Sequence, residues 1–547
     1  MSDFIYKWER YWCPKGATYQ TDGLGYSSAP SRYNANTLAF DQIAEARCLI
    51  LLGEPGMGKS FVLEDEQRNA EMVARAKGDA ANLVDLRQYG TGDEVRQALF
   101  RNPCFLRWDS GEHHLETYID SLDECRLRVE TVASLLVDEL KNYLAERLSL
   151  RLACRTADWS YLLERGLRKQ WGENAVKVYE LIPLTREDVA EAARVNSLDA
   201  DRFLRDVESR SVVPLATRPT TLRMLLRIYK REGTLPATQA ELYRQGCLEL
   251  CAETNESRLD SGRTGAYTAE QRMIVAARIA AAMMFSQRAA VWKGANRSSA
   301  ESEDVILSEL RGGRETAQGE HFSVSDAALR EALGTGLFAA RTGADRMGWA
   351  HATYGEFLAT WYLVEHGVTL EQAMSLIAHP DDPEQKIVPQ MYETVAWLAA
   401  MMPEVFGRVL QTDPKVLLRV DEAAVGSADR AALTVALLNM YDEGSVHDDW
   451  ESHAQYRKLS HPALHSQLEP FVRDKGKNII VRRVAIEIAE VCKVGELQGD
   501  LADIALDANE PLAVRVSAAG AVSEIGNSAT RGTINLTSRT DRTDERK

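Results

Sequence analysis

A glycine-rich stretch close to residue 55 has the composition of a phosphate-binding loop. It reads Gly-Glu-Pro-Gly-Met-Gly-Lys-Ser and matches the pattern G-x-x-x-x-G-K-[ST]. In such a loop the glycines allow backbone N–H groups to turn inward around phosphate oxygens, and the following helix adds the positive end of its dipole. The sequence therefore predicts a nucleotide-binding loop made of Gly53, Glu54, Pro55, Gly56, Met57, Gly58, Lys59 and Ser60.

Two side chains of the loop and one later carboxylate complete a magnesium nucleotide site. Lys59 would place a positive charge on the terminal phosphates, and the Ser60 hydroxyl would ligate Mg²⁺. Asp120 stands at the carboxyl end of an apolar run at 115–119, which is where parallel sheets put their ligands. We expect Asp120 to hold Mg²⁺ through water, with ATP or ADP as the bound nucleotide.

Three further residues have the chemistry to act on the terminal phosphate. Asp123 and Glu124 follow Asp120 closely, and either carboxylate could orient or deprotonate an attacking water. The alternative for this pair is that it caps the helix that follows. Arg155 ends a strand-like run at 148–155, which puts a guanidinium near the γ-phosphate edge; the alternative is a solvated arginine at a strand end.

The elements that must position these residues alternate between strand and helix. The apolar run 48–52 suits a strand buried on both faces, and 60–78 reads as a helix that Gly78 ends. Glu116 and Thr117 interrupt the apolar run that carries Asp120, so we expect that strand to be less buried. Further strands are predicted at 79–90 and 175–181 in addition to 115–119 and 148–155. The alternation predicts an α/β core with a doubly wound parallel sheet and flanking helices.

The order of these motifs resembles that of the NACHT-family STAND NTPases. The matching stretches are "GEPGMGKS" at 53–60, "YIDSLDE" at 118–124, "ACRTADW" at 153–159 and "YELIPLTREDV" at 179–189. Residues 217–250 resemble the helical segment that follows the sheet in this family, and 336–363 resemble the end of its winged helix. The resemblance covers roughly residues 45–365.

The resemblance implies a switch that works by slow, regulatory ATP hydrolysis. Resting members of the family hold ADP between the sheet domain and the winged helix, and activated members exchange it for ATP and form homo-oligomers. Carried over, Pro219 contacts the nucleotide, His351 contacts the β-phosphate, and Arg155 senses the γ-phosphate. The alternative for His351 is an ordinary packed or solvated histidine. For bacterial-looking members the family implies antiviral defence.

The remaining sequence suggests several further domains. Two stretches, 481–492 and 514–525, have Val-Arg pairs 33 residues apart and resemble helices of HEAT repeats; an ordinary helical bundle is the alternative. Polar stretches at 254–266, 293–304 and 312–321 are expected to be loops. The predicted domains are an N-terminal arm (1–45), the NTPase core (46–195), a helical domain (196–265), a winged-helix domain (266–365), an α-helical solenoid of HEAT-like repeats (366–530) and a polar tail (531–547).

Composition narrows the class of protein. The chain has 547 residues, 45% hydrophobic and 27% charged, with a formal net charge of −16, which disfavours nonspecific nucleic-acid binding. Its eight cysteines form no CxxC pair, so we expect free thiols in a reducing cytoplasm. The N-terminus has no apolar signal-peptide region, and the most apolar stretch, 276–285, is too short to span a bilayer, so no membrane partner is expected.

These features favour an ATP/ADP-dependent switch that senses a protein ligand through its C-terminal helices. Two other classes stay open. An AAA+-like remodelling motor would need an arginine finger acting between subunits and steady turnover. A STAND transcription regulator would need a DNA-reading helix, and no basic recognition helix is evident outside the winged-helix segment. The sequence does not identify the activating ligand or the output, and it does not separate ATP from GTP.

Overall fold

The computed structural model divides the chain into two compact units, Met1–Tyr362 and Leu363–Lys547. It describes residues 9–531 except 33, 55, 87–88, 112, 123–124, 126, 128, 144, 157–158, 253–265, 295, 342–344, 445–452 and 529. Within these residues, no helix combines the length and the apolar character needed to cross a membrane. All eight cysteines are free thiols.

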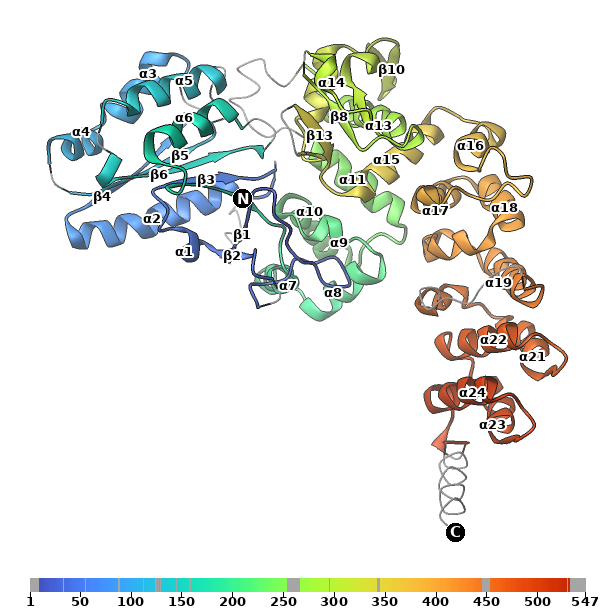
Figure 1. Ribbon diagram of the computed structural model, residues 1–547. Helices are drawn as coiled ribbons and strands as arrows, with labels where there is room; N and C mark the ends of the chain where they lie inside the picture. Colours follow the sequence, from blue (N-terminus) through green and yellow to red (C-terminus); the bar gives the residue numbers. More distant parts are fainter. Residues whose placement is uncertain are drawn as a thin grey trace. The chain divides into compact units, whose positions relative to one another are not determined.

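A seven-stranded sheet organises the first unit (Figure 1). Its order is β2-β1-β7-β3-β6-β5-β4, and the neighbours from β7 to β4 pair in parallel. The strands are β1 Tyr11–Pro14, β2 Leu38–Ala39, β3 Cys48–Leu52, β4 Ala80–Asp85, β5 Leu115–Asp120, β6 Leu148–Cys154 and β7 Val176–Leu181. The predicted mostly parallel sheet is confirmed. The antiparallel edge strands β1 and β2 were not predicted, because they belong to the segment expected to be an arm.

Helices cover both faces of this sheet, as the apolar run of β3 requires. Every residue of β3 is buried, and alternate residues enter opposite cores. Cys48, Ile50 and Leu52 pack in a core with α3 (Gly92–Phe100), α4 (Pro103–Ser110), α5 (Val129–Leu140) and α6 (Tyr161–Trp171). Leu49 and Leu51 pack in a second core with α1 (Phe40–Ile43), α2 (Lys59–Lys77) and Trp12 of β1.

Strand β5 is more buried than its sequence suggests. Thr117 is buried and donates a hydrogen bond of 2.9 Å to the Asn82 Oδ1 on β4. Glu116 forms an ion pair of 2.9 Å with Arg151 on β6. The expectation of a less buried strand is wrong because its polar side chains find partners on both neighbouring strands.

Further helices and a second sheet complete the first unit. The helices are α7 Arg186–Val195, α8 Ala200–Ser209, α9 Val213–Ala216, α10 Pro219–Glu232, α11 Gln239–Cys251, α13 Ala269–Phe285, α14 Asp326–Leu333 and α15 Ala352–Glu365. The second sheet has the order β12-β13-β8-β9, with β8 Ala290–Trp292, β9 Asp304–Ile306, β12 Phe338–Ala340 and β13 Arg346–Trp349.

The predicted loop at 312–321 is wrong, because a hairpin occupies it. Strands β10 (Arg314–Ala317) and β11 (Glu320–Ser323) pair antiparallel. They are joined by Gln318 and Gly319, whose φ angles of 52° and 82° suit a tight two-residue hairpin turn. The stretch is polar, yet Glu315 on β10 is buried and accepts a hydrogen bond of 2.8 Å from the Tyr362 hydroxyl. This anchored carboxylate explains why so polar a segment is ordered.

The second unit is helical over most of its described residues (Figure 1, orange to red). Its α-helices are α16 Leu370–Ile377, α17 Tyr392–Met401, α18 Pro403–Thr412, α19 Ser427–Asp442, α21 Leu464–Arg473, α22 Ile479–Val491, α23 Gln498–Leu506 and α24 Leu512–Ile525. The similar stretches 481–492 and 514–525 fall on α22 and α24, which pack against each other.

Candidate functional site

The glycine-rich loop lies between β3 and α2, the strand–loop–helix context that the motif needs. Gly56 and Gly58 have φ angles of 76° and 86°, which side-chain-bearing residues rarely adopt. Gly58 is the N-cap of α2, so the first amides of the helix follow directly from the loop. Pro55 lies outside the described residues. The two glycine φ angles and the helix N-terminus are compatible with a phosphate-binding loop.

The Lys59 side chain bends back onto the loop. The Lys59 ammonium donates hydrogen bonds to the carbonyl oxygens of Gly53 and, at 3.2 Å, of Glu54. The Oε2 of Glu54 is buried and has no hydrogen-bond partner within the described structure. Burial raises the pKa of Glu54, and the positive charges of Arg218 and Lys59 oppose that rise. The loop thus holds one carboxylate whose charge depends on the cations around it.

The N-terminus of α10 touches the loop from outside. The Thr220 hydroxyl donates a hydrogen bond of 3.2 Å to the Gly56 carbonyl. A Cβ on Gly56 would lie 2.5 Å from that hydroxyl, and one on Gly58 would lie 3.9 Å from the ring of Pro219. Pro219 is buried as the first residue of the helix. The structure therefore brings Pro219, a residue named from the family resemblance, next to the phosphate loop.

Arg218, which the sequence reasoning missed, lies at the same helix end. It connects that end to two places beside the second sheet, Gly336 before β12 and Tyr354 after β13. It is buried and donates a hydrogen bond of 2.7 Å to the Gly336 carbonyl. Its guanidinium carbon lies 5.7 Å from the centre of the Tyr354 ring, a cation–π distance. Its one signal in the sequence was its position directly before Pro219.

His351 belongs to the same neighbourhood. It lies between β13 and α15, and its Nδ1 accepts a hydrogen bond of 3.3 Å from the Thr353 amide. The residue is exposed, yet the protein atoms surrounding its ring and the positive charge of Arg218 lower the pKa of His351 to about 4. The imidazole is therefore neutral near pH 7. Because Nδ1 accepts, Nε2 carries the proton and can donate to an anion.

Arg155 and Asp120 lie at the carboxyl ends of their strands. Arg155 directly follows β6, is buried, and donates a hydrogen bond of 3.1 Å to the Gly334 carbonyl, so the solvated-arginine alternative is wrong. Asp120 is the buried last residue of β5, and Ser121 after it has a left-handed φ of 59°. Asp123 and Glu124 lie outside the described residues, and their roles remain predictions.

The oxygen donors available at this edge suit a magnesium nucleotide. Ser60 lies in the first turn of α2 and Asp120 ends β5, so a hydroxyl and a carboxylate stand at the carboxyl edge of one parallel sheet. Mg²⁺ prefers oxygen ligands and usually takes few from the protein, the others coming from water and phosphate. Within the described residues, no group of three or more His, Cys, Asp and Glu side chains is arranged to hold a metal. The donor set fits Mg²⁺ carried with a nucleotide.

A second missed residue, Arg10, contacts the loop from the N-terminal segment. It is buried and donates hydrogen bonds to the carbonyl oxygens of Met57, at 2.7 Å, and Ile182, at 2.8 Å. These acceptors are 47 and 172 residues away in the chain, so no local pattern could reveal the contact.

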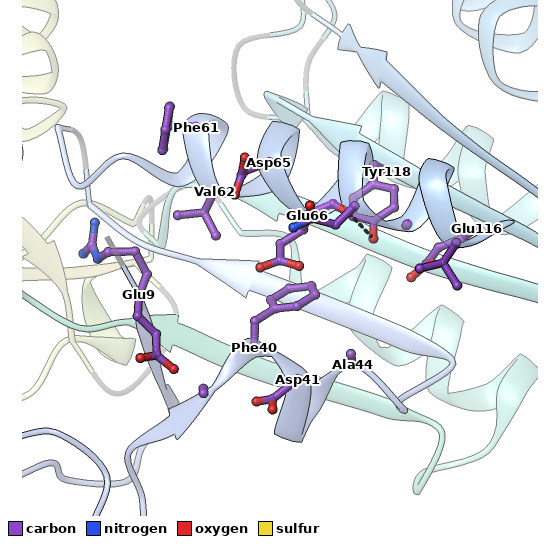
Figure 2. Close-up of a pocket in the computed structure, with 15 residues that line it drawn as sticks. Glu9, Phe40, Asp41, Ala44, Phe61, Val62, Asp65, Glu66, Glu116 and Tyr118 are labelled. Atoms are coloured by element: carbon purple, nitrogen blue, oxygen red, sulfur yellow. Dashed lines mark hydrogen bonds between the residues drawn. The ribbon is translucent and has the colours of Figure 1, made fainter. Parts of the chain in front are cut away.

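A cavity of about 520 Å³ lies beside the loop, between α1, α2 and β5 (Figure 2). Phe40 and Tyr118 line it together with Arg10. Its acidic lining residues are Glu9, Asp41, Asp65, Glu66 and Glu116. Burial and the neighbouring carboxylates of Asp65 and Glu116 raise the pKa of Glu66 to about 7. So acidic a lining disfavours phosphate in this cavity.

No protein-family model matches the chain, and a search of curated proteins gives no match.

Proposed function

We propose that the chain is a nucleotide-controlled molecular switch of the NACHT-type STAND class. In this proposal the α/β core binds ATP or ADP with Mg²⁺, and a winged-helix domain at 266–365 closes on the nucleotide. The helices at 366–530 form a solenoid of HEAT-like repeats that senses a protein ligand. Nucleotide exchange permits homo-oligomerisation, in the cytoplasm and in the service of antiviral defence.

One observation carries the proposal: the N-terminal end of α10 contacts the phosphate loop and also Gly336 and Tyr354, which flank the strand pair β12–β13. Thr220 bonds to Gly56 of the loop, and Arg218, two residues earlier, bonds to Gly336. A ligand can shift two parts of a protein only through contacts that differ between its states. A short helix end that touches both parts gives a nucleotide in the loop a direct route to the segment that would close on it.

The residues would divide the work as follows. The loop amides and Lys59 hold the phosphates, while Ser60 and Asp120 hold Mg²⁺. The metal neutralises charge on the phosphates. Asp123 or Glu124 positions the attacking water. Three residues from other elements, Arg155, Pro219 and His351, report which nucleotide is present.

The experiment that tests the proposal combines the nucleotide retained after purification with the variant Lys59→Ala. We expect the wild-type protein to retain ADP, and Lys59→Ala to lose ADP binding because it removes the charge placed on the phosphates. Titration calorimetry with added ADP measures the ADP affinity of the wild type and of Lys59→Ala. Lys77→Ala, at the exposed other end of the same helix, is the control and should bind as the wild type does.

Three results would separate the classes. Equal ADP affinity of the wild type and Lys59→Ala would refute the phosphate cradle. An empty protein with fast ATP turnover would favour the remodelling motor. Retained ADP with slow turnover supports the switch.

A further inference from the structure

Arg10 contacts the phosphate loop from the N-terminal segment, in which the sequence analysis identified no motif. It directly precedes β1, the antiparallel strand that pairs with β7 at the edge of the main sheet. From there its Nη1 bonds to the Met57 carbonyl in the loop, and its Nη2 bonds to the Ile182 carbonyl just after β7. One guanidinium thus ties the loop to the end of a neighbouring strand.

The hydrogen bond to the Met57 carbonyl restrains the whole peptide plane between Met57 and Gly58. The Met57 C=O and the Gly58 N–H belong to one peptide plane, and in a planar trans peptide these two groups point in opposite directions. In a phosphate loop the N–H groups must point inward, so the carbonyls must point outward. By bonding to the Met57 carbonyl, Arg10 restrains this peptide plane and with it the direction of the Gly58 N–H.

Glycine makes such an external restraint necessary. Gly58 has a φ of 86°, and a residue without a Cβ has few barriers that keep its peptide planes in one orientation. A Cβ at this position would lie 3.6 Å from the Arg10 guanidinium, so the two residues are in close contact. The flexibility that lets the loop turn is limited at this peptide by Arg10.

Burial of this arginine is unfavourable. Burial lowers the pKa of Arg10 to about 10, and Asp188 partly offsets the effect. A fork-shaped guanidinium can hold two carbonyls at once, whereas an ammonium is a point charge without fixed donor directions. The two carbonyls carry no opposite charge, so only the Asp188 carboxylate offsets the positive charge of Arg10, and it does so in part.

We infer that Arg10 is a positioning residue that preorganises the Gly58 amide for phosphate and adds a positive charge behind the loop. The inference rests on the proposed nucleotide function. It assigns the N-terminal segment a role in phosphate binding that its sequence did not indicate.

The test compares Arg10→Met, Arg10→Lys and Lys15→Met in the full chain. Lys15 is the matched control: it lies on the same segment, its side chain is 42% exposed, and its ion pair of 3.8 Å is with Glu164, away from the loop. Displacement of a fluorescent ADP by ADP, inorganic pyrophosphate and adenosine gives the affinities. Hydrogen exchange of the peptide covering 53–61, without nucleotide, reports the loop itself.

We expect Arg10→Met to weaken ADP and pyrophosphate at least tenfold while adenosine changes less than twofold. Exchange of the loop should become faster, Arg10→Lys should fall between Arg10→Met and the wild type, and Lys15→Met should match the wild type. Equal losses for all three ligands, or no loss at all, would overturn the inference. If Arg10→Met does not fold, Arg10→Lys decides by the same ratio of pyrophosphate to adenosine affinity.

The design also separates this inference from the proposed function. If the wild type and Lys59→Ala bind ADP equally poorly, the nucleotide function fails, whatever Arg10 does to the loop. If the wild type binds ADP, Lys59→Ala does not, and Arg10→Met binds as the wild type does, only the inference fails.

Discussion

Buried arginines are held differently beside the phosphate loop and in the helical second unit. The Arg482 side chain on α22 is 2% exposed and forms two hydrogen bonds, of 2.6 and 3.1 Å, with the Glu510 carboxylate before α24. Arg10 and Arg218 bond instead to backbone carbonyls, and neither forms an ion pair within the described part of the chain. Glu510 neutralises the charge of Arg482 directly. The carbonyls bonded to Arg10 and Arg218 do not, and the carboxylates of Asp188 and Glu54 act on these two arginines without forming an ion pair.

This difference in hydrogen-bond partners indicates the role of each arginine. A carbonyl satisfies a donor without cancelling the cation, so positive charge accumulates where the surroundings are poorly solvated and attracts an anion. A bidentate carboxylate cancels the cation, and such a pair connects elements without attracting a ligand. The comparison predicts that loss of Arg482 damages stability alone, whereas loss of an arginine at the loop damages binding of anions.

The largest effect is expected from Arg482→Met. It leaves the Glu510 carboxylate buried without its main partner, which costs about 3–5 kcal/mol of unfolding free energy in typical buried pairs. Denaturant unfolding followed by hydrogen exchange on α22 and α24 measures it. Arg483→Met, at a half-buried neighbour on the same helix that forms an ion pair of 3.5 Å with Glu487, should cost about 0.5 kcal/mol or less.

The pair also has a pH signature of known sign. The hydrogen bonds from Arg482 lower the pKa of Glu510 in the folded state. Its stabilisation is therefore complete above the ordinary pKa of a glutamate and is lost as pH falls through the lowered value. ADP affinity that changed with Arg482→Met would contradict the division into structural and binding arginines.

Compared with Arg482→Met, Arg218→Gln should change the stability less and the ADP affinity more. The amide can still donate one hydrogen bond to Gly336, so the loss of stability should be about 1–2 kcal/mol. The positive charge disappears, so ADP affinity should fall about tenfold, which corresponds to about 1.4 kcal/mol. Titration calorimetry measures binding and thermal unfolding measures stability.

Arg223→Gln controls for the helix that carries Arg218. Arg223 lies on the exposed face of α10, so its substitution should change neither quantity. If Arg218→Gln lowered stability without weakening ADP, Arg218 would be grouped with Arg482 and the comparison would fail.

The sequence predicted the local parts of this site well. The strands that carry the loop, Asp120 and Arg155 were predicted within one residue at their ends, because continuous apolar runs and strand-end polar residues are local signals. Arg10 and Arg218 were missed because their acceptors lie 47 to 172 residues away and exist only in the folded chain. The hairpin at 314–323 was missed because its buried glutamate looks like a loop residue until its partners are known.

The smallest effect concerns His351, whose pKa responds to the charge of Arg218. The protein atoms around the exposed ring and the charge of Arg218 lower the pKa of His351 to about 4 from the ordinary 6.5, so the folded protein disfavours the protonated ring. The stabilisation is complete above pH 6.5 and declines as pH falls toward 4, because the unfolded chain then binds more protons. His351→Gln should flatten this decline, and the effect is modest because solvent screens an exposed ring.

Unfolding measured at several pH values between 7 and 4.5 tests this, with His321→Gln on the exposed hairpin as control. Arg218→Gln should bring the pKa of His351 back toward its ordinary value and so shrink the same slope. Bound ADP should act in the same direction, because an anion near the ring favours its protonation. If neither Arg218→Gln nor bound ADP changed the slope of stability against pH, His351 would not sense the charge at the loop. His351 would then have no part in the switch.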